Sequence, residues 1–152
     1  MNSKECFELA KWAITHARKC GAQDVAVDVR DRREIEVQFR DQSIEKLQEA
    51  NRHSLAISTY LNNRYSSQNT NNLKKDFLEK FIEEAVASTK YLSEDPYRKL
   101  PDPKYYSGRE KKELELRDPS YESVKTEHRI ESARAAAFAS SSASDRIVSV
   151  TS

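Results

Sequence analysis

The segment HSLAISTYLNNRYSSQNT, residues 53–70, decides the fold, because it holds two strand-like stretches on either side of an asparagine pair. In the first stretch Leu55, Ile57 and Thr59 occupy every second position, the period of a strand with one buried face. Two-residue connections are the commonest in hairpins, and their favoured turns need positive φ, which asparagine tolerates. Asn62 and Asn63 therefore predict a tight hairpin turn rather than a loop that holds a ligand.

Three further segments before this hairpin are candidates for strands. Residues 25–30 and 34–40 alternate in the same way, with DRR (31–33) and DQ (41–42) as the expected turns. The segment SIEKLQEA (43–50) is ambiguous, because Ile44 and Leu47 have helical spacing. An isolated helix of two turns would be marginal in water, so a bulged strand is favoured. These segments predict an antiparallel or mixed sheet of about four to five strands.

Two helices are expected to pack on this sheet. Residues 3–20 carry apolar or small residues three and four apart, with Ser3 as the expected N-cap and Gly21 just past the end. Residues 72–91 carry a broad apolar stripe, and Asn71 or Asn72 is the expected cap. Cys6 and Cys20 fall on the apolar side of the first helix and are expected to be small buried residues rather than nucleophiles.

The chain changes character after Tyr91. Residues 92–118 hold three of the four prolines and predict an extended connector. A third helix is expected from near Asp118-Pro119 or Ser123 to about Ser140, followed by a strand in DRIVSV (145–150). The prediction is an α+β fold: a compact unit over 1–91, a proline-rich connector over 92–118, and a helix plus strand over 119–152. The last part would begin an incomplete continuation of the same domain.

Bulk composition argues against several partners. Twenty-six basic and 25 acidic residues give a net charge of +1, which provides no general attraction to nucleic acid or to an anionic membrane. There is no apolar run of about 18 residues and no apolar core of a signal peptide at the N-terminus. Cys6 and Cys20 lie about 21 Å apart along one helix, too far for a disulfide. A reducing, cytoplasmic location is the simplest interpretation.

No complete active site is visible in the sequence. The chain lacks a glycine-rich phosphate loop and the HExxH motif, and its histidines are His16, His53 and His128. His128 and Glu131 lie one helical turn apart and could begin a metal site, although a solvated charged helix face is the simpler interpretation. His16 is expected to interact with the dipole at the end of its helix. No catalytic residue and no metal ligand are therefore predicted in this chain.

Several stretches together resemble the N-terminal domain of the TldD/PmbA family, also called modulators of DNA gyrase or TldD/TldE metallopeptidases. They are AKWAITHARKCGAQDVAVDV (10–29), VQFRDQSIEKLQEA (37–50), LAISTYLNNRYSSQNTNNLKKDFLEKFIEEAVASTKYLSEDPYRKLPDP (55–103) and LELRDPSYESVKTEHRIESARAAAFASSSASDRIVSV (114–150). The resemblance departs at Ser54 and Ser66, where relatives usually carry glycine. The segment LSEDP (92–96) is slightly more similar to the PmbA/TldE type.

The resemblance implies a non-catalytic domain of a peptidase that cleaves unfolded peptides. Its zinc would belong to a C-terminal half or to a partner subunit, with no cofactor in this chain. The expected partners are a second TldD/PmbA-type subunit, as a homo- or heterodimer, and unfolded peptide, with no nucleic acid and no membrane. Peptide or partner contacts are expected at Tyr60, Arg64, Tyr65 and Gln68. Two alternatives stay open: a stand-alone interaction or adaptor module, and a small independent enzyme.

Overall fold

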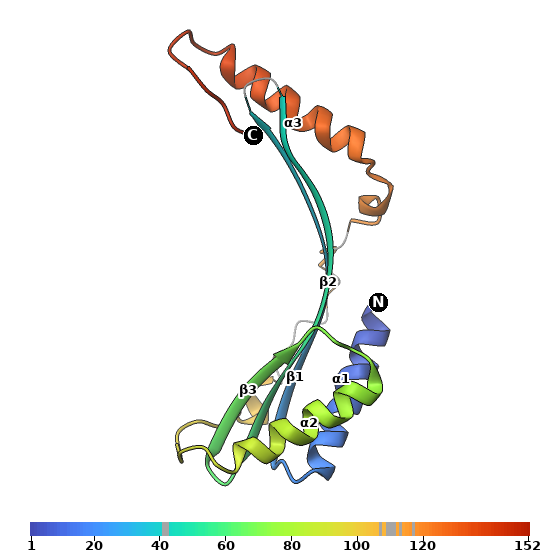
Figure 1. Ribbon diagram of the computed structural model, residues 1–152, viewed down its shortest axis with the longest axis vertical. Coiled ribbons are helices and arrows are strands. Elements are labelled where there is room, and N and C mark those ends of the chain that lie inside the picture. Colours follow the sequence, from blue (N-terminus) through green and yellow to red (C-terminus); the bar gives the residue numbers. More distant parts are fainter. Residues whose placement is uncertain (41–42, 107, 109–111, 113, 117) are drawn as a thin grey trace. The chain divides into compact units, whose positions relative to one another are not determined.

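A computed structural model of the protein describes residues 1–40, 43–106, 108, 112, 114–116 and 118–152. The helices are α1 (Ser3–Lys19), α2 (Lys75–Thr89) and α3 (Thr126–Ser141), and the strands are β1 (Asp24–Arg40), β2 (Ser43–Leu61) and β3 (Arg64–Thr70) (Figure 1). Two short 3-10 helices cover Pro103–Tyr106 and Tyr121–Ser123. The α+β class is confirmed. The strands form one antiparallel sheet in the order β1-β2-β3, so the prediction of four to five strands is wrong.

The sheet has fewer strands than predicted because the triplet DRR does not form a turn. Residues 31–33 lie inside β1, and SIEKLQEA lies inside β2. The apolar residues on either side of the triplet, Val29 and Ile35, are six positions apart, so the two-residue period continues without a break. Arg33 pairs with Glu49 at 2.8 Å and Lys46 with Glu36 at 2.8 Å, which links the two polar strands. The turn expected at residues 41–42 lies outside the described residues.

The chain divides into two compact units, and the long strands contribute to both. Unit 1 contains Met1–Arg32 and Asn51–Arg109, and unit 2 contains Arg33–Ala50 and Glu110–Ser152. Each unit is therefore built from two separate stretches of chain. In unit 1 both α1 and α2 cover the same face of the sheet (Figure 1). No helix among the described residues is long and apolar enough to cross a bilayer.

The core of unit 1 lies between the sheet and the two helices. The alternation predicted for residues 55–59 is confirmed, since Leu55, Ile57 and Thr59 are buried. The helices contribute small residues from α1 and larger ones from α2. The buried apolar cluster consists of Ala13, Ala17, Ala22, Val25, Leu55, Ile57, Leu78, Ile82, Ala85 and Val86. The small α1 side chains let this helix approach α2 closely, while Leu78 and Ile82 fill the space over the sheet.

The turn between β2 and β3 has the predicted conformation. Asn62 and Asn63 have φ of 49° and 57°, both positive, and Leu61 pairs with Arg64. This is the primed type of two-residue turn, whose twist matches that of the strands. It fixes the register in which Thr59 faces Ser66.

Three hydroxyl groups meet on the helix-covered face of the sheet. The Thr59 hydroxyl lies 2.7 Å from that of Thr89 and 2.9 Å from that of Ser66. Ser66 and Thr89 are 2.8 Å apart, and Thr89 donates to the carbonyl oxygen of Ala85 at 2.8 Å. Thr59 and Thr89 are fully buried, so this network satisfies polar groups that would otherwise be unpaired beneath α2.

The helix ends differ in detail from the prediction. The N-cap of α1 is Asn2, not Ser3, and it forms a capping box with Glu5. Gly21 has φ of 104°, and the Gly21 and Ala22 N–H groups donate to Arg18 and Ala17, which is the Schellman arrangement. Helix α2 begins at Lys75 without a side-chain cap. The Asn72 side chain instead accepts from the Lys74 N–H at 3.2 Å, just before the helix.

Unit 2 has a thin core. Of its described residues only Phe39 and Ala137 are buried and apolar. Helix α3 begins at Thr126, later than expected, because Asp118 accepts hydrogen bonds from the Ser120 N–H and hydroxyl in a turn. The strand predicted over 145–150 does not form. Among the described residues, the chain end is attached to β1 by an antiparallel bridge between Arg40 and Thr151, where Phe39 and Ser152 exchange two backbone hydrogen bonds of 3.0 Å.

Candidate functional site

The four predicted contact residues lie on or beside the β2–β3 hairpin in unit 1, but they do not form one surface. Tyr60 and Tyr65 lie on the sheet face opposite the helices, since their neighbours Thr59 and Ser66 face α2. Gln68 lies on the helix face and donates to the Ser88 hydroxyl at 3.0 Å. All of these side chains are half-buried rather than freely exposed.

Tyr60 and Tyr65 form a pair across the two strands. Their ring centroids are 5.0 Å apart, and the Arg98 guanidinium lies 4.7 Å from the Tyr65 centroid. Burial raises the pKa of Tyr60. The pKa of Tyr65 is lowered, first by hydrogen bonding with Ser58 and Ser67. The connector thus places the Arg98 cation over the Tyr65 ring of this pair.

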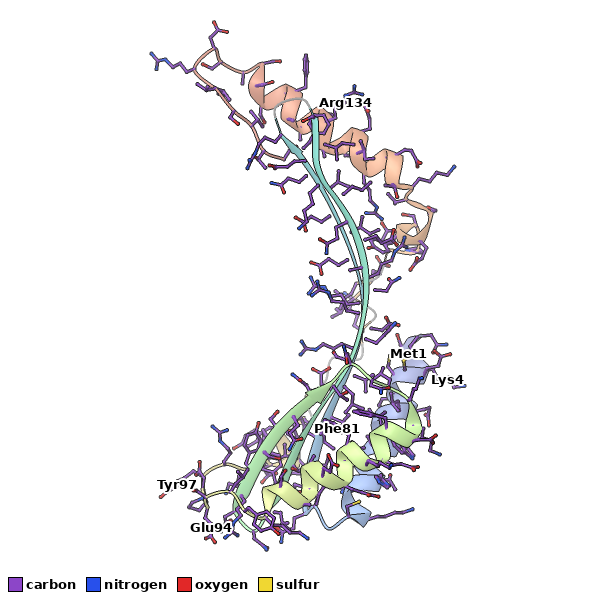
Figure 2. The ribbon with its side chains drawn as sticks, in the orientation of Figure 1. Met1, Lys4, Phe81, Glu94, Tyr97 and Arg134 are labelled. Atoms are coloured by element: carbon purple, nitrogen blue, oxygen red, sulfur yellow. The ribbon has the colours of Figure 1, made fainter. Side chains whose placement is uncertain are left out.

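Arg64 fastens the start of the connector to the hairpin. It pairs with Glu94 at 2.7 Å and donates to the Leu92 carbonyl oxygen at 2.9 Å. The Asp95 N–H also donates to the Asn63 carbonyl oxygen, at 2.6 Å. Glu94, labelled in Figure 2, lies at the end of unit 1 that carries the hairpin turn. Arg64 therefore has a structural role in this arrangement, and its donors are largely used.

Strand β3 forms an open edge of the sheet, and its outward-facing backbone groups are candidates for peptide contact. Of the four predicted contact residues, only Tyr65 contributes such backbone groups. In an antiparallel pair, hydrogen-bonded and non-hydrogen-bonded positions alternate. Because the two-residue turn makes Leu61–Arg64 a hydrogen-bonded pair, the N–H and C=O groups of Tyr65, Ser67 and Asn69 point away from β2. Within the part of the chain that the structure describes, no backbone group beyond the sheet bonds to these three residues. Such an edge can receive an added strand.

The three histidines have different surroundings. His53 lies 2.9 Å from Asp31 in unit 1, and His128 is exposed on α3 in unit 2. His16 lies on α1 beside two possible ligands, Cys20 and Glu83. Sequence reasoning missed this group, although the four-residue spacing of His16 and Cys20 on one helix was a usable signal. Cys6 and Cys20 are free, as expected, but both are only half-buried.

A groove of about 570 Å³ lies within unit 2. Its wall combines the end of β1, helix α3 and the C-terminal segment, including Phe39, Ala137, Phe138, Ile147 and Val148. Arg134, labelled in Figure 2, provides the basic group at its wall. Val148 is 95% exposed and Phe138 is 71% exposed, so the groove is surrounded by uncovered apolar side chains.

Comparison with known proteins gives a consistent result. The chain matches no family model and no curated protein. Among solved structures it resembles a proposed modulator of DNA gyrase from Bacteroides thetaiotaomicron, with a TM-score of 0.88 and 35% identity over 99% of this chain. A proposed modulator of a DNA gyrase from Thermotoga maritima gives a TM-score of 0.67 and 16% identity over 95% of the chain. TldE from Thermococcus kodakarensis gives 0.71 and 16% over 94%.

This chain is much shorter than these proteins. It covers 34% of the Bacteroides chain and 32% of each of the other two. The resemblance nevertheless extends over nearly all of the present sequence. The chain therefore has the fold of the TldD/PmbA family, the family of the proposed modulators of DNA gyrase, and it corresponds to about a third of such a protein.

Proposed function

We propose that this chain is a non-catalytic N-terminal domain of a TldD/PmbA-type metallopeptidase subunit, and that it provides scaffold and partner contacts in the cytoplasm. The observation that carries the proposal is the 35% identity over 99% of this chain with only 34% of the Bacteroides protein. In this proposal zinc and peptide cleavage belong to other parts of the assembly, and the partner is a second subunit of the same family.

The surface of unit 2 supports a role in contacts. Two apolar side chains are buried among its described residues, whereas eight large ones are exposed. The exposed set is Ile44, Leu47, Leu114, Leu116, Tyr121, Phe138, Ile147 and Val148. Exposed apolar area on this scale, beside so small a core, is typical of a surface that another polypeptide covers.

A partner-binding experiment tests this role. The purified chain is mixed with a TldD/PmbA-type subunit, and the complex is measured by size-exclusion chromatography with light scattering. The variant Val148→Asp should weaken association at least tenfold, since it places a charge in an apolar contact. Tyr91→Asp is the matched control, because Tyr91 is 88% exposed but belongs to unit 1. Equal binding by wild type and both variants would count against the proposed contact surface.

Peptide cleavage gives a second, independent readout. The chain alone should not hydrolyse an unfolded casein-type peptide, whereas the assembled subunits should. Turnover by the purified chain alone, with or without chelator, would refute the non-catalytic assignment.

The open edge of β3 supports a role in peptide contact. Main-chain hydrogen bonding to an edge strand is tolerant of sequence, which suits unfolded peptide. The Ser67 N–H points outward, so Ser67→Pro removes one edge donor while leaving the β2–β3 bonds in place. This variant should lose peptide binding in fluorescence polarisation, and Ser67→Ala should keep it. Tyr65→Ala tests the side-chain contribution, and equal binding by wild type and Ser67→Pro would contradict strand addition.

The alternative is a stand-alone adaptor module that uses the same edge. Both functions predict peptide binding by Ser67→Ala and its loss in Ser67→Pro. Association with a TldD/PmbA-type subunit separates them, because only the peptidase domain requires it.

A further inference from the structure

Three side chains from two helices of unit 1 bring a nitrogen, a sulfur and an oxygen ligand together. His16 and Cys20 are four residues apart near the C-terminal end of α1, and Glu83 lies on α2. Their ligand atoms all lie within 4.8 Å of one another. The four-residue spacing places His16 and Cys20 on the same helix face, and the packing of α1 on α2 brings Glu83 to that face.

The hydrogen bonding of His16 is incomplete. Its Nε2 atom is shielded from solvent and has no hydrogen-bond partner among the described residues. The Glu83 carboxylate oxygen lies 3.6 Å away, which is longer than a hydrogen bond. Trp12 stacks on the imidazole, with ring centroids 5.6 Å apart and an interplanar angle of 11°. A buried polar atom without a hydrogen-bond partner needs an explanation, and a bound ion is one.

We propose that His16, Cys20 and Glu83 bind one borderline transition-metal ion, with Zn²⁺ as the favoured ion and water in the fourth position. Imidazole, thiolate and carboxylate are the donor types that Zn²⁺ takes in proteins. With bonds of about 2.0–2.3 Å, ligand atoms around tetrahedral zinc lie about 3.5 Å apart, so small side-chain rotations complete the site. The metal would join α1 to α2.

The electrostatics of the site fit a cation. Cysteine binds Zn²⁺ as the thiolate, and the Glu83 carboxylate adds a second negative charge that a divalent cation neutralises. The proposed ion stabilises the helix pair and is separate from the zinc expected for the peptidase reaction, so this inference does not depend on the proposed function.

The test is metal titration of the whole chain after reduction and removal of metal by chelator. Co²⁺ is added as the spectroscopic probe, and Zn²⁺ is then titrated in competition by calorimetry. One equivalent of Co²⁺ should produce a sulfur-to-cobalt charge-transfer band, and Zn²⁺ should displace it. Zn²⁺ should also raise the melting temperature of the wild-type chain, because a ligand that binds only the folded state stabilises it.

Variants identify the ligands. Cys20→Ser should abolish the charge-transfer band, whereas Cys6→Ser, which changes the other free cysteine of the same helix, should retain it. Glu83→Gln should weaken Zn²⁺ binding at least tenfold, whereas Glu84→Gln, at the exposed neighbouring position, should not. Melting curves without metal establish that each variant folds. The proposal is overturned if the folded wild type binds no Co²⁺, or if the band survives Cys20→Ser.

Discussion

The hydroxyl network beneath α2 makes a quantitative prediction about Thr89→Val. Three hydroxyl protons serve four contacts in this network: Thr59–Thr89, Ser66–Thr89, Thr59–Ser66, and Thr89 to the Ala85 carbonyl oxygen. At most three hydrogen bonds can form at once, because each hydroxyl has one proton. Thr89 is a partner in three of the four contacts, so its hydroxyl is the centre of the network.

Counting protons gives the size of each effect. Thr89→Val leaves only Thr59 and Ser66 to bond each other, so two of three hydrogen bonds are lost. Thr59→Val leaves Ser66 donating to Thr89 and Thr89 donating to Ala85, so one is lost. A net hydrogen bond contributes about 0.5–1.5 kcal/mol to stability. Thr89→Val should therefore cost about 2 kcal/mol and Thr59→Val about 1 kcal/mol.

Urea unfolding at equilibrium measures the difference. Trp12 is the only tryptophan and lies in unit 1, so its fluorescence follows the unit that contains the network. The free energy of unfolding comes from the midpoint and slope of the transition. Both variants gain the same buried methyl group, so this gain cancels in the comparison. If Thr59→Val costs as much as Thr89→Val, the proton count is wrong.

Three further predictions concern a turn, a helix end and pH. Asn63→Ala should lower the free energy of unfolding by about 1 kcal/mol, because Asn63 has a positive φ that alanine adopts poorly. Asn63→Gly should not lower it, and chemical denaturation of both variants measures the difference. Gly21→Ala should lower the free energy of unfolding by about 1 kcal/mol, because Gly21 has a φ of 104°, which alanine adopts only with strain. The added methyl group itself meets no atom within 4 Å, so an unchanged denaturation midpoint would show that this backbone strain is absent. The pKa of Asp31 is lowered, first because its carboxylate accepts a hydrogen bond from the Met1 ammonium group. The stability that ionised Asp31 contributes is therefore present above the ordinary carboxyl pKa and is lost as the pH falls through the lowered value. Melting temperatures between neutral and acidic pH should therefore fall less in Asp31→Asn than in wild type, and identical profiles would exclude this contribution.

Local signals in the sequence predicted the local structure well. Asn62 and Asn63 predicted a tight turn, and Gly21 predicted the end of α1, because both depend on the conformational freedom of one or two residues. The charged triplet 31–33 was wrongly predicted to turn. Its charges resembled a loop, but the alternation of apolar residues on either side continues in phase across it, which is the signal of a single long strand.

Features that depend on packing between elements could not be predicted. His16 and Cys20 are visible as a pair in the sequence, but Glu83 joins them only when α2 packs on α1. The contact between Thr59 and Thr89 likewise joins a strand to the end of a helix 30 residues later. The predicted contact residues Tyr60, Arg64, Tyr65 and Gln68 are adjacent along the hairpin, but alternation places their side chains on different faces.

The continuity of β1 and β2 through both units limits how this fold can change in evolution. Successive side chains alternate between the two faces of the sheet. Deleting a single residue from the middle of one strand would therefore move every later side chain of that strand to the opposite face. Removing two residues from each strand would preserve the facing of Val25 and Leu55 in one unit and of Phe39 in the other. Homologous proteins should therefore differ in the length of these strands by even numbers of residues, changed in both strands together.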